Sequence, residues 1–296
     1  MNTKDLNGME CEDLLLQLVE NDDVDLFKQK VDALSFAWFA DKPSNDDLLS
    51  LIGFLDLTSL ADTENDLSIK RMSDASVFDY KGESYTVAGV CSYSNLIGSI
   101  NKYKKNKNIR SVVVSAGFPH SQLSLDAKLE DIVYSVKNGA DEIDICLNRG
   151  VFLEGAYNEV GDEISRIRDL IKTLNGKTAL KVILETGELD SMSKIMKASL
   201  LALESGADFI KTSTGKISKG ADIYSVCVML LAIRKYFFKH GVMKGLKVSG
   251  GVNTSLQALE YRQIHRFFTS VAYDSPNYFR IGCSRLLENI EKEINQ

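Results

Sequence analysis

Two hydrophobic patterns follow one another along the chain. Over residues 1–46 the apolar positions recur at the spacing of one face of an amphipathic helix. These positions include Leu14, Leu15, Leu18, Val19, Val31, Leu34 and Trp38. From Leu48 onward, short apolar runs alternate with amphipathic stretches, which is typical of the strand and helix units of a parallel sheet. We therefore predict a helical extension over residues 1–46 and an α/β domain over residues 47–296.

The apolar runs of the α/β domain predict eight strands. We place them near residues 51–57, 86–92, 110–116, 141–147, 180–186, 208–213, 245–249 and 279–282. Helical stretches separate them, as at 125–138, 191–204 and 223–239. Eight such units favour a closed (β/α)8 TIM barrel, a fold of about 250 residues. An open doubly wound sheet is the alternative fold, but no Gly-x-Gly-x-x-Gly sequence follows the first strand.

A repeated turn supports this periodicity. Residues 137–141 and 204–208 both join a helix to a strand, and both end in Gly-Ala-Asp. The glycines suit the left-handed position that commonly closes a helix. We interpret the repeat as structural and assign it no chemical role.

The composition is that of a globular protein. Hydrophobic residues make up 44% of the 296 residues and charged residues 26%, both near the usual averages. The formal net charge is -6 and the pI is about 5.3, so no basic field is available for the many phosphates of a nucleic acid. A single phosphate needs only a local pocket of backbone N–H groups, so a small anionic substrate fits this charge.

The sequence predicts neither export nor membrane insertion. The first 22 residues lack the basic region and apolar run of a signal peptide, and the longest apolar stretches are too short to span a bilayer. The five cysteines are an odd number without paired spacing, which argues against a disulfide framework. We therefore expect reduced thiols, a cytoplasmic location, and neither nucleic acid nor membrane as a partner.

Ionisable residues stand at the ends of several predicted strands. Asp56, Asp144, Lys211 and Lys247 each interrupt or end an apolar run. Taken singly, each is explained as a solvated strand end. Barrel enzymes, however, build their sites at the carboxyl ends of several strands, and a charge in a strand buried on both faces is costly unless it is paired or used. The joint pattern therefore predicts an active site.

Two inward lysines on neighbouring strands have a specific chemical use. A lysine with its ordinary pKa of about 10.4 is protonated at neutral pH and cannot attack a carbonyl. Burial and a second ammonium group nearby disfavour the charged form and release the nucleophile. We therefore predict that Lys211 forms a Schiff base, that Lys247 favours its neutral form, and that Asp144 relays protons.

Glycines after the last two predicted strands add a second element. Gly250, Gly251 and Gly282 lie where barrels often bind phosphate on backbone N–H groups. A glycine pair alone is more often a tight turn, but it gains weight beside the two lysines. No two of the three histidines stand at ligand spacing, and we predict them to be surface residues, with no metal and no cofactor.

These residues carry a resemblance to a known family. The most specific segments are residues 180–189 (Leu-Lys-Val-Ile-Leu-Glu-Thr-Gly-Glu-Leu) and 206–216 (Gly-Ala-Asp-Phe-Ile-Lys-Thr-Ser-Thr-Gly-Lys), supported by 56–58, 117–120 and 139–144. From Leu51 to Glu288 the chain resembles the deoxyribose-phosphate aldolases. The resemblance implies a TIM-barrel class I lyase that cleaves 2-deoxy-D-ribose 5-phosphate into acetaldehyde and D-glyceraldehyde 3-phosphate, in deoxyribonucleotide catabolism and without a cofactor.

The resemblance also implies roles for single residues. It matches Lys211 with the Schiff-base lysine, Lys247 with the second lysine, Asp144 with the proton-relay acid and Asp56 with a supporting acid. The implied pocket and phosphate-binding residues are Thr58, Cys91, Thr214, Gly215, Lys216, Gly250, Gly251, Gly282 and Ser284. For partners, it implies a small phosphorylated sugar as substrate, and we expect a homo-oligomer, a dimer.

The chain departs from the family pattern near the phosphate site. Val248 and Ser249 stand where proline and alanine are common, and Asn253 stands where a basic residue is common. Arg285 replaces a second serine, and the chain ends without the tyrosine that some members use in catalysis. Two alternatives remain, namely a related Schiff-base aldolase of another sugar phosphate and a non-catalytic barrel that binds a phosphorylated metabolite.

Overall fold

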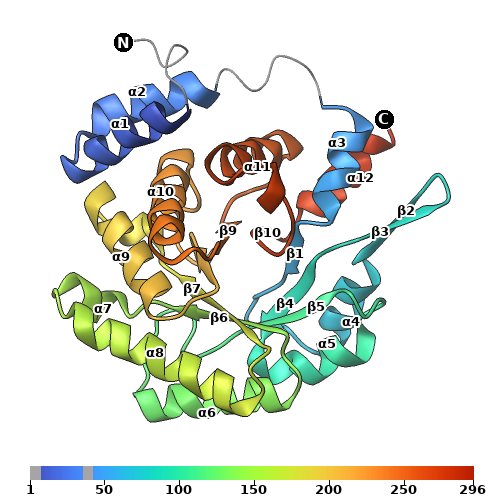
Figure 1. Ribbon diagram of the computed structural model, residues 1–296. Coiled ribbons are helices and arrows are strands. Elements are labelled where there is room, and N and C mark those ends of the chain that lie inside the picture. Colours follow the sequence, from blue (N-terminus) through green and yellow to red (C-terminus); the bar gives the residue numbers. More distant parts are fainter. Residues whose placement is uncertain (1–7, 36–42) are drawn as a thin grey trace.

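Eight parallel strands form a closed barrel in the computed structural model, which describes residues 8–35 and 43–296 (Figure 1). Each strand pairs with the next one along the chain, and the last pairs with the first, so the predicted TIM barrel is confirmed. The barrel strands are β1 (Leu55–Thr58), β4 (Gly89–Tyr93), β5 (Arg110–Val114), β6 (Glu142–Cys146), β7 (Ala179–Ile183), β8 (Phe209–Lys211), β9 (Gly245–Ser249) and β10 (Phe279–Cys283).

Helices surround the barrel and cover its outer face (Figure 1). They are α3 (Asn45–Ile52), α4 (Asp66–Asp74), α5 (Ile97–Tyr103), α6 (Leu125–Lys137), the short α7 (Arg149–Leu153), α8 (Tyr157–Leu174), α9 (Met192–Glu204), α10 (Ile223–His240), α11 (Ser255–Thr269) and α12 (Leu286–Ile294). No helix in the described part of the chain has the length and apolar composition that a bilayer crossing needs.

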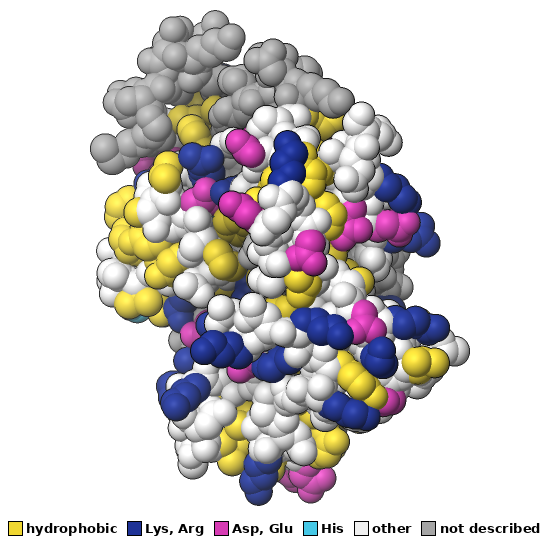
Figure 2. All heavy atoms as spheres, turned by 90° about the vertical axis from the view of Figure 1, so that its right-hand side faces the viewer, with side chains coloured by type: hydrophobic (Ala, Val, Ile, Leu, Met, Phe, Trp, Pro, Cys, Tyr) yellow, Lys and Arg dark blue, Asp and Glu magenta, His cyan; other side chains and the backbone are white. Residues whose placement is uncertain are grey.

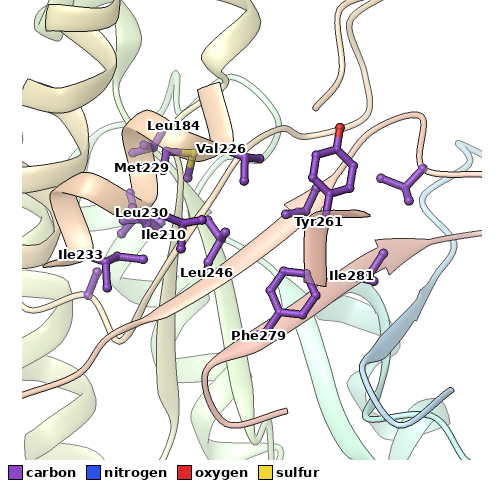
Figure 3. Close-up of a cluster of buried hydrophobic side chains, with 14 of the residues drawn as sticks. Leu184, Ile210, Val226, Met229, Leu230, Ile233, Leu246, Tyr261, Phe279 and Ile281 are labelled. Carbon is purple, nitrogen blue, oxygen red and sulfur yellow. The ribbon is translucent and has the colours of Figure 1, made fainter. Parts of the chain in front are cut away.

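The alternation of side chains along the strands separates the core from the barrel interior. Ile210 on β8 and Leu246 on β9 point outward and lie beside Leu230 of α10 in the apolar cluster of Figure 3. Because successive strand residues point to opposite faces, Lys211 and Lys247 point into the barrel. These two lysines are also direct partners in the register of β8 and β9. The core packing and the register together therefore bring the two ammonium groups to one level of the barrel.

The repeated Gly-Ala-Asp turn lies at the amino end of the barrel. Asp141 accepts a hydrogen bond from the backbone N–H of Ser111 at 2.8 Å, and Asp208 accepts one from Leu180 at 2.9 Å. Each aspartate thus ties the start of its own strand to the strand before it. This is a structural function, as we predicted.

Helices α1 (Gly8–Glu20) and α2 (Val24–Ser35) pack against α9 and α10 (Figure 1). Leu15 and Phe27 are fully buried. The carboxylate of Asp22 accepts a hydrogen bond from the N–H of Met192, the first residue of α9, at 3.1 Å. The helical extension is therefore part of the packed molecule. The division at residue 46 stays a prediction, and Trp38 lies outside the described residues.

Two sequence predictions near the start of the barrel need correction. Residues 51 and 52 end helix α3, and β1 begins only at Leu55. The buried positions 48, 49, 51 and 52 have helical spacing, so an apolar run of this length is ambiguous without its tertiary contacts. An unpredicted hairpin, β2 (Val77–Tyr80) and β3 (Glu83–Thr86), precedes β4, so Thr86 belongs to the hairpin.

Acidic side chains lie among the lysines on the side of the barrel that carries α4 and α5. Figure 2 shows both kinds of charge mixed over this face. Lys105 Nζ lies 2.5 Å from Asp74 Oδ1, and Lys102 Nζ lies 3.7 Å from Asp66 Oδ2. The lysine-rich segment 102–107 therefore faces acidic neighbours, which reduces its attraction for phosphates.

His265 on α11 is fully buried, so its prediction as a surface residue was wrong. It lies on the inner face of the helix, and its ring centroid is 5.0 Å from that of Phe279 on β10. Burial disfavours the charged ring and lowers the pKa of His265 to about 4.

We expect this buried histidine to weaken the fold in mild acid. The unfolded side chain takes up a proton below its ordinary pKa of about 6.5, whereas the folded one stays neutral to about pH 4. Its contribution to stability is therefore complete above pH 6.5 and is lost as the pH falls toward 4. Between pH 7 and pH 5 the free energy of unfolding should fall by about 2 kcal/mol more in the wild type than in His265→Leu. Urea titrations at both pH values measure this, and equal losses would contradict it.

Candidate active site

Asp144 lies at the centre of a group of buried lysines. Its Oδ2 atom is 2.9 Å from Lys211 Nζ and 2.8 Å from Lys247 Nζ. Its Oδ1 atom is 2.9 Å from Lys181 Nζ. The three lysines come from the consecutive strands β7, β8 and β9, and the aspartate comes from β6. The structure therefore brings together the three catalytic residues predicted for Schiff-base chemistry and adds a third lysine.

Two further carboxylates and an arginine complete the group. Asp56 Oδ2 lies 2.6 Å from Lys247 Nζ, and Glu142 Oε2 lies 2.6 Å from Lys181 Nζ. The guanidinium of Arg280 on β10 donates to both of these carboxylates. We call these seven residues the charge cluster: Asp56, Glu142, Asp144, Lys181, Lys211, Lys247 and Arg280.

The charge cluster is closed off from solvent. Asp56, Asp144, Lys181 and Lys247 are 0% exposed, and Lys211 is 2% exposed. Glycine makes room for these long side chains, because a Cβ atom at Gly282 would lie 3.1 Å from Lys247 Cε, closer than ordinary van der Waals contact. Buried charges of this kind persist only when their partners lie within hydrogen-bonding distance, as they do here.

Mutual attraction holds the protonation states of the cluster. Burial alone would raise the pKa of Asp144, but the neighbouring ammonium groups outweigh burial and hold this pKa well below its usual range. Burial would lower the pKa of Lys247, but the carboxylates of Asp144 and Asp56 raise it well above its usual value. Asp144 is therefore a carboxylate and Lys247 an ammonium group at neutral pH.

A pocket of about 320 Å³ opens above the cluster at the carboxyl end of the barrel. Lys211 is the member of the charge cluster that lines it. Of the nine pocket and phosphate-binding residues implied by the resemblance, eight line this pocket: Thr58, Thr214, Gly215, Lys216, Gly250, Gly251, Gly282 and Ser284. Cys91, the ninth, is fully buried beside Val112 and Val114 below the pocket, and burial raises the pKa of its thiol.

The wall of the pocket is built from glycine turns. Gly215, Gly250 and Gly251 have φ angles of 78°, 89° and 82°, which side chains rarely adopt. Such turns can direct backbone N–H groups toward an anion. Lys216 adds a cation at the edge, where its Nζ donates to the carbonyl of Leu60 at 2.5 Å. The pocket thus has an amine at its floor and glycine turns and a lysine cation at its rim.

Sequence reasoning missed Lys181, Glu142 and Arg280 as site residues. Lys181 and Arg280 are each set between apolar neighbours within a barrel strand, and Glu142 begins β6 directly after Asp141. Lys181 and Arg280 therefore carry the same signal that identified Lys247 and Asp144. Their pairing exists only in the folded sheet, where Lys181 is the register partner of Asp144 and closure of the barrel brings Arg280 to Asp56.

The closed barrel and its pocket place the protein among the TIM-barrel enzymes. A model of the DeoC/LacD aldolase family matches residues 80–266. The deoxyribose-phosphate aldolase of Mus musculus is 35% identical over 259 residues, which cover 83% of this chain and 80% of the mouse protein. The chain therefore belongs to the DeoC/LacD aldolases and is a carbon–carbon lyase.

Solved structures share the fold. A protein provisionally assigned as deoxyribose-phosphate aldolase in Toxoplasma gondii ME49 has a TM-score of 0.74 at 22% identity, over 85% of this chain and 95% of that chain. The tetrameric deoxyribose phosphate aldolase of Aeropyrum pernix has a TM-score of 0.60 at 23% identity, over 85% of this chain and 98% of that one.

We expect removal of Arg280 to destabilise the protein strongly. Arg280→Leu leaves the carboxylates of Asp56 and Glu142 buried with one cation fewer, and breaking a buried pair in this way costs about 3–5 kcal/mol. Urea unfolding followed by circular dichroism measures the loss. Lys172→Ala is the control, because it removes an exposed ion pair with Asp169 and should leave the midpoint in place. Similar midpoints for the two variants would contradict the argument.

Proposed function

We propose that this aldolase cleaves 2-deoxy-D-ribose 5-phosphate into acetaldehyde and D-glyceraldehyde 3-phosphate through a Schiff base on Lys211. The observation that carries the proposal is the pocket itself, with Lys211 on its floor and glycine turns and Lys216 around it. A short sugar fits this arrangement if its aldehyde meets Lys211 and its phosphate meets the glycine turns and Lys216. The name of the mouse relative supports the same substrate.

The charge balance of the cluster supports Lys211 as the nucleophile. Four cationic side chains face three carboxylates, so one proton can leave without unbalancing the buried charge. Arg280 keeps its proton at any ordinary pH. Lys181 and Lys247 each contact two carboxylates, whereas Lys211 contacts Asp144 alone among the described residues. Lys211 is therefore the lysine that the carboxylates of the cluster hold by the fewest contacts.

The geometry supports the following sequence of steps. Lys211 Nζ attacks C1 of the open-chain aldehyde, and the carbinolamine loses water to give a protonated imine. Loss of the proton from the C3 hydroxyl then breaks the C2–C3 bond. C3 becomes the aldehyde carbon of D-glyceraldehyde 3-phosphate, which leaves, and the electrons of the broken bond pass into the imine to form an enamine on Lys211. Protonation at C2 and hydrolysis release acetaldehyde and restore the amine. Asp144, 2.9 Å from Lys211 Nζ, is placed to carry protons to and from the carbinolamine.

Membership of the aldolase family disfavours a barrel that only binds its ligand. A related sugar phosphate as substrate remains the alternative, and it bears on the pocket because Asn253 lies on the lining where a basic residue is common in the family. Turnover of 2-deoxyribose 5-phosphate against ketose phosphates of similar length separates the two. A higher kcat/KM for a ketose phosphate than for 2-deoxyribose 5-phosphate would refute the proposed substrate and favour the ketose phosphate.

The Schiff base can be trapped directly. Borohydride reduction of the enzyme in the presence of 2-deoxyribose 5-phosphate should leave a stable adduct on the peptide that contains Lys211, and mass spectrometry identifies it. Lys211→Arg, which keeps the charge, should give no adduct and reduce kcat by at least about a thousandfold, since no covalent path remains. An active enzyme with an adduct elsewhere, or with none, would contradict the mechanism.

Loss of Lys247 should move the pH dependence of the reaction. Lys247→Leu removes a positive charge beside Asp144, so the same carboxylate holds the Lys211 proton to a higher pH. The acid limb of kcat/KM against pH is therefore expected to shift upward by about one unit or more. Lys244→Leu is the control, because Lys244 precedes the same strand at the amino end of the barrel. An unchanged profile in Lys247→Leu would exclude the coupling.

The cysteines bear on the cellular setting. All five are free and buried, which supports a reducing compartment such as the cytoplasm. A role in deoxyribonucleotide catabolism follows from the proposed substrate, which is a deoxyribose phosphate. The dimer stays a prediction, and the relative from Aeropyrum pernix is a tetramer. Light scattering of the purified protein distinguishes these assemblies.

A further inference from the structure

Glu185, two residues after the end of β7, has two unusual properties. Its backbone lies in the left-handed region, with φ 55° and ψ 60°, although it is not glycine. Its side chain is 1% exposed. Non-glycine residues in this region persist where the surrounding structure holds them, and they concentrate at functional sites. The conformation therefore directs attention to the contacts of the Glu185 carboxylate.

Both carboxylate oxygens of Glu185 bind one residue of the pocket wall. Oε1 accepts from the N–H of Thr214 at 3.1 Å, and Oε2 accepts from its hydroxyl at 2.5 Å. The Thr214 hydroxyl oxygen in turn accepts from the N–H of Lys216 at 3.0 Å. These bonds close the turn through Gly215, and Thr214, Gly215 and Lys216 all line the pocket.

The loop between β8 and α10, residues 212–222, is held on both sides. A Cβ atom at Gly187, two residues after Glu185, would lie 2.7 Å from the carbonyl oxygen of Lys219. On the other side, Ala221 donates its N–H to the carbonyl of Gly250 at 3.0 Å. The loop between β8 and α10 is thus clamped between the ends of β7 and β9. Glu185 supplies the side-chain contacts that hold Thr214, a residue of the pocket lining.

We infer that Glu185 is a positioning residue that sets the preference of this enzyme for a phosphorylated substrate. It does not touch the reacting atoms. It holds Thr214, Gly215 and Lys216 in the shape that receives the phosphate, while the charge cluster below is built without it. This inference rests on the proposed function, because it assigns the phosphate to this side of the pocket.

The test separates phosphate recognition from chemistry. Glu185→Ala and the wild type are compared with 2-deoxyribose 5-phosphate and with unphosphorylated 2-deoxyribose. We expect KM for the phosphorylated sugar to rise about tenfold or more, since a charged hydrogen-bonding partner is lost. kcat and the kcat/KM for 2-deoxyribose should stay within about twofold. Glu185→Gln should restore most of the loss, because its amide can bind both groups of Thr214.

Asp208→Ala is the matched control. Asp208 directly precedes β8, and its carboxylate accepts a hydrogen bond from the N–H of Leu180 on β7, at the amino end of the same two strands. It should lower stability without changing the ratio of kcat/KM for the two sugars. Should Glu185→Ala fail to fold, Thr214→Val removes the same hydroxyl bond and Thr214→Ser keeps it, so the selective rise in KM is expected in the first alone.

Binding of inorganic phosphate, measured by calorimetry, keeps the two proposals apart. Its Kd should rise about tenfold in Glu185→Ala and stay unchanged in Asp208→Ala, whether or not the wild type cleaves 2-deoxyribose 5-phosphate. A wild type that binds phosphate in this way but cleaves neither sugar refutes the proposed function alone. Equal losses for both sugars, an unchanged phosphate Kd, or no recovery in Glu185→Gln overturns the inference on Glu185.

Discussion

The ion pairs of Asp144 are the interaction on which the site depends. One carboxylate, fully removed from water, contacts three ammonium groups from three neighbouring strands. Each of these charges would be costly to bury alone, and each is tolerated because the others are present. Removal of one charge from the cluster therefore destabilises the others. Its four cations exceed its three carboxylates by one, which is the charge balance that the proposed nucleophile Lys211 requires.

The barrel supplies what such a cluster requires. Parallel strands in register set Lys211 opposite Lys247, and alternation of side chains sends both inward while the apolar neighbours pack against α10. Closure of the sheet brings Arg280 from the last strand to Asp56 on the first and Glu142 on β6. The rigid lower part thus fixes the charges. The loops above, held by contacts such as those of Glu185, shape the pocket around the substrate.

The reach of sequence reasoning differs between the two parts of the site. Asp144, Lys211 and Lys247 could be predicted, because a charge buried in an apolar strand is costly unless it is paired or used. Lys181 gave the same signal, but its contacts with Glu142 and Asp144 depend on the register of β6 and β7, which the sequence does not show. Glu185 also interrupts the apolar run of its predicted strand, but its left-handed backbone and its bonds to Thr214 exist only after β7 and β8 are paired.

The sequence by itself determined the alternation of strands and helices, the barrel that follows from eight such units, and the residues that carry charge into it. It did so because hydrophobic periodicity and the position of a charged residue within an apolar run are local properties that each segment shows separately. The tertiary structure decided where β1 begins, that His265 is buried, and which charge meets which. Those outcomes depend on contacts between residues distant in the chain. The distance between Lys247 and Asp56, on strands that open and nearly close the barrel, is decided only when the sheet closes.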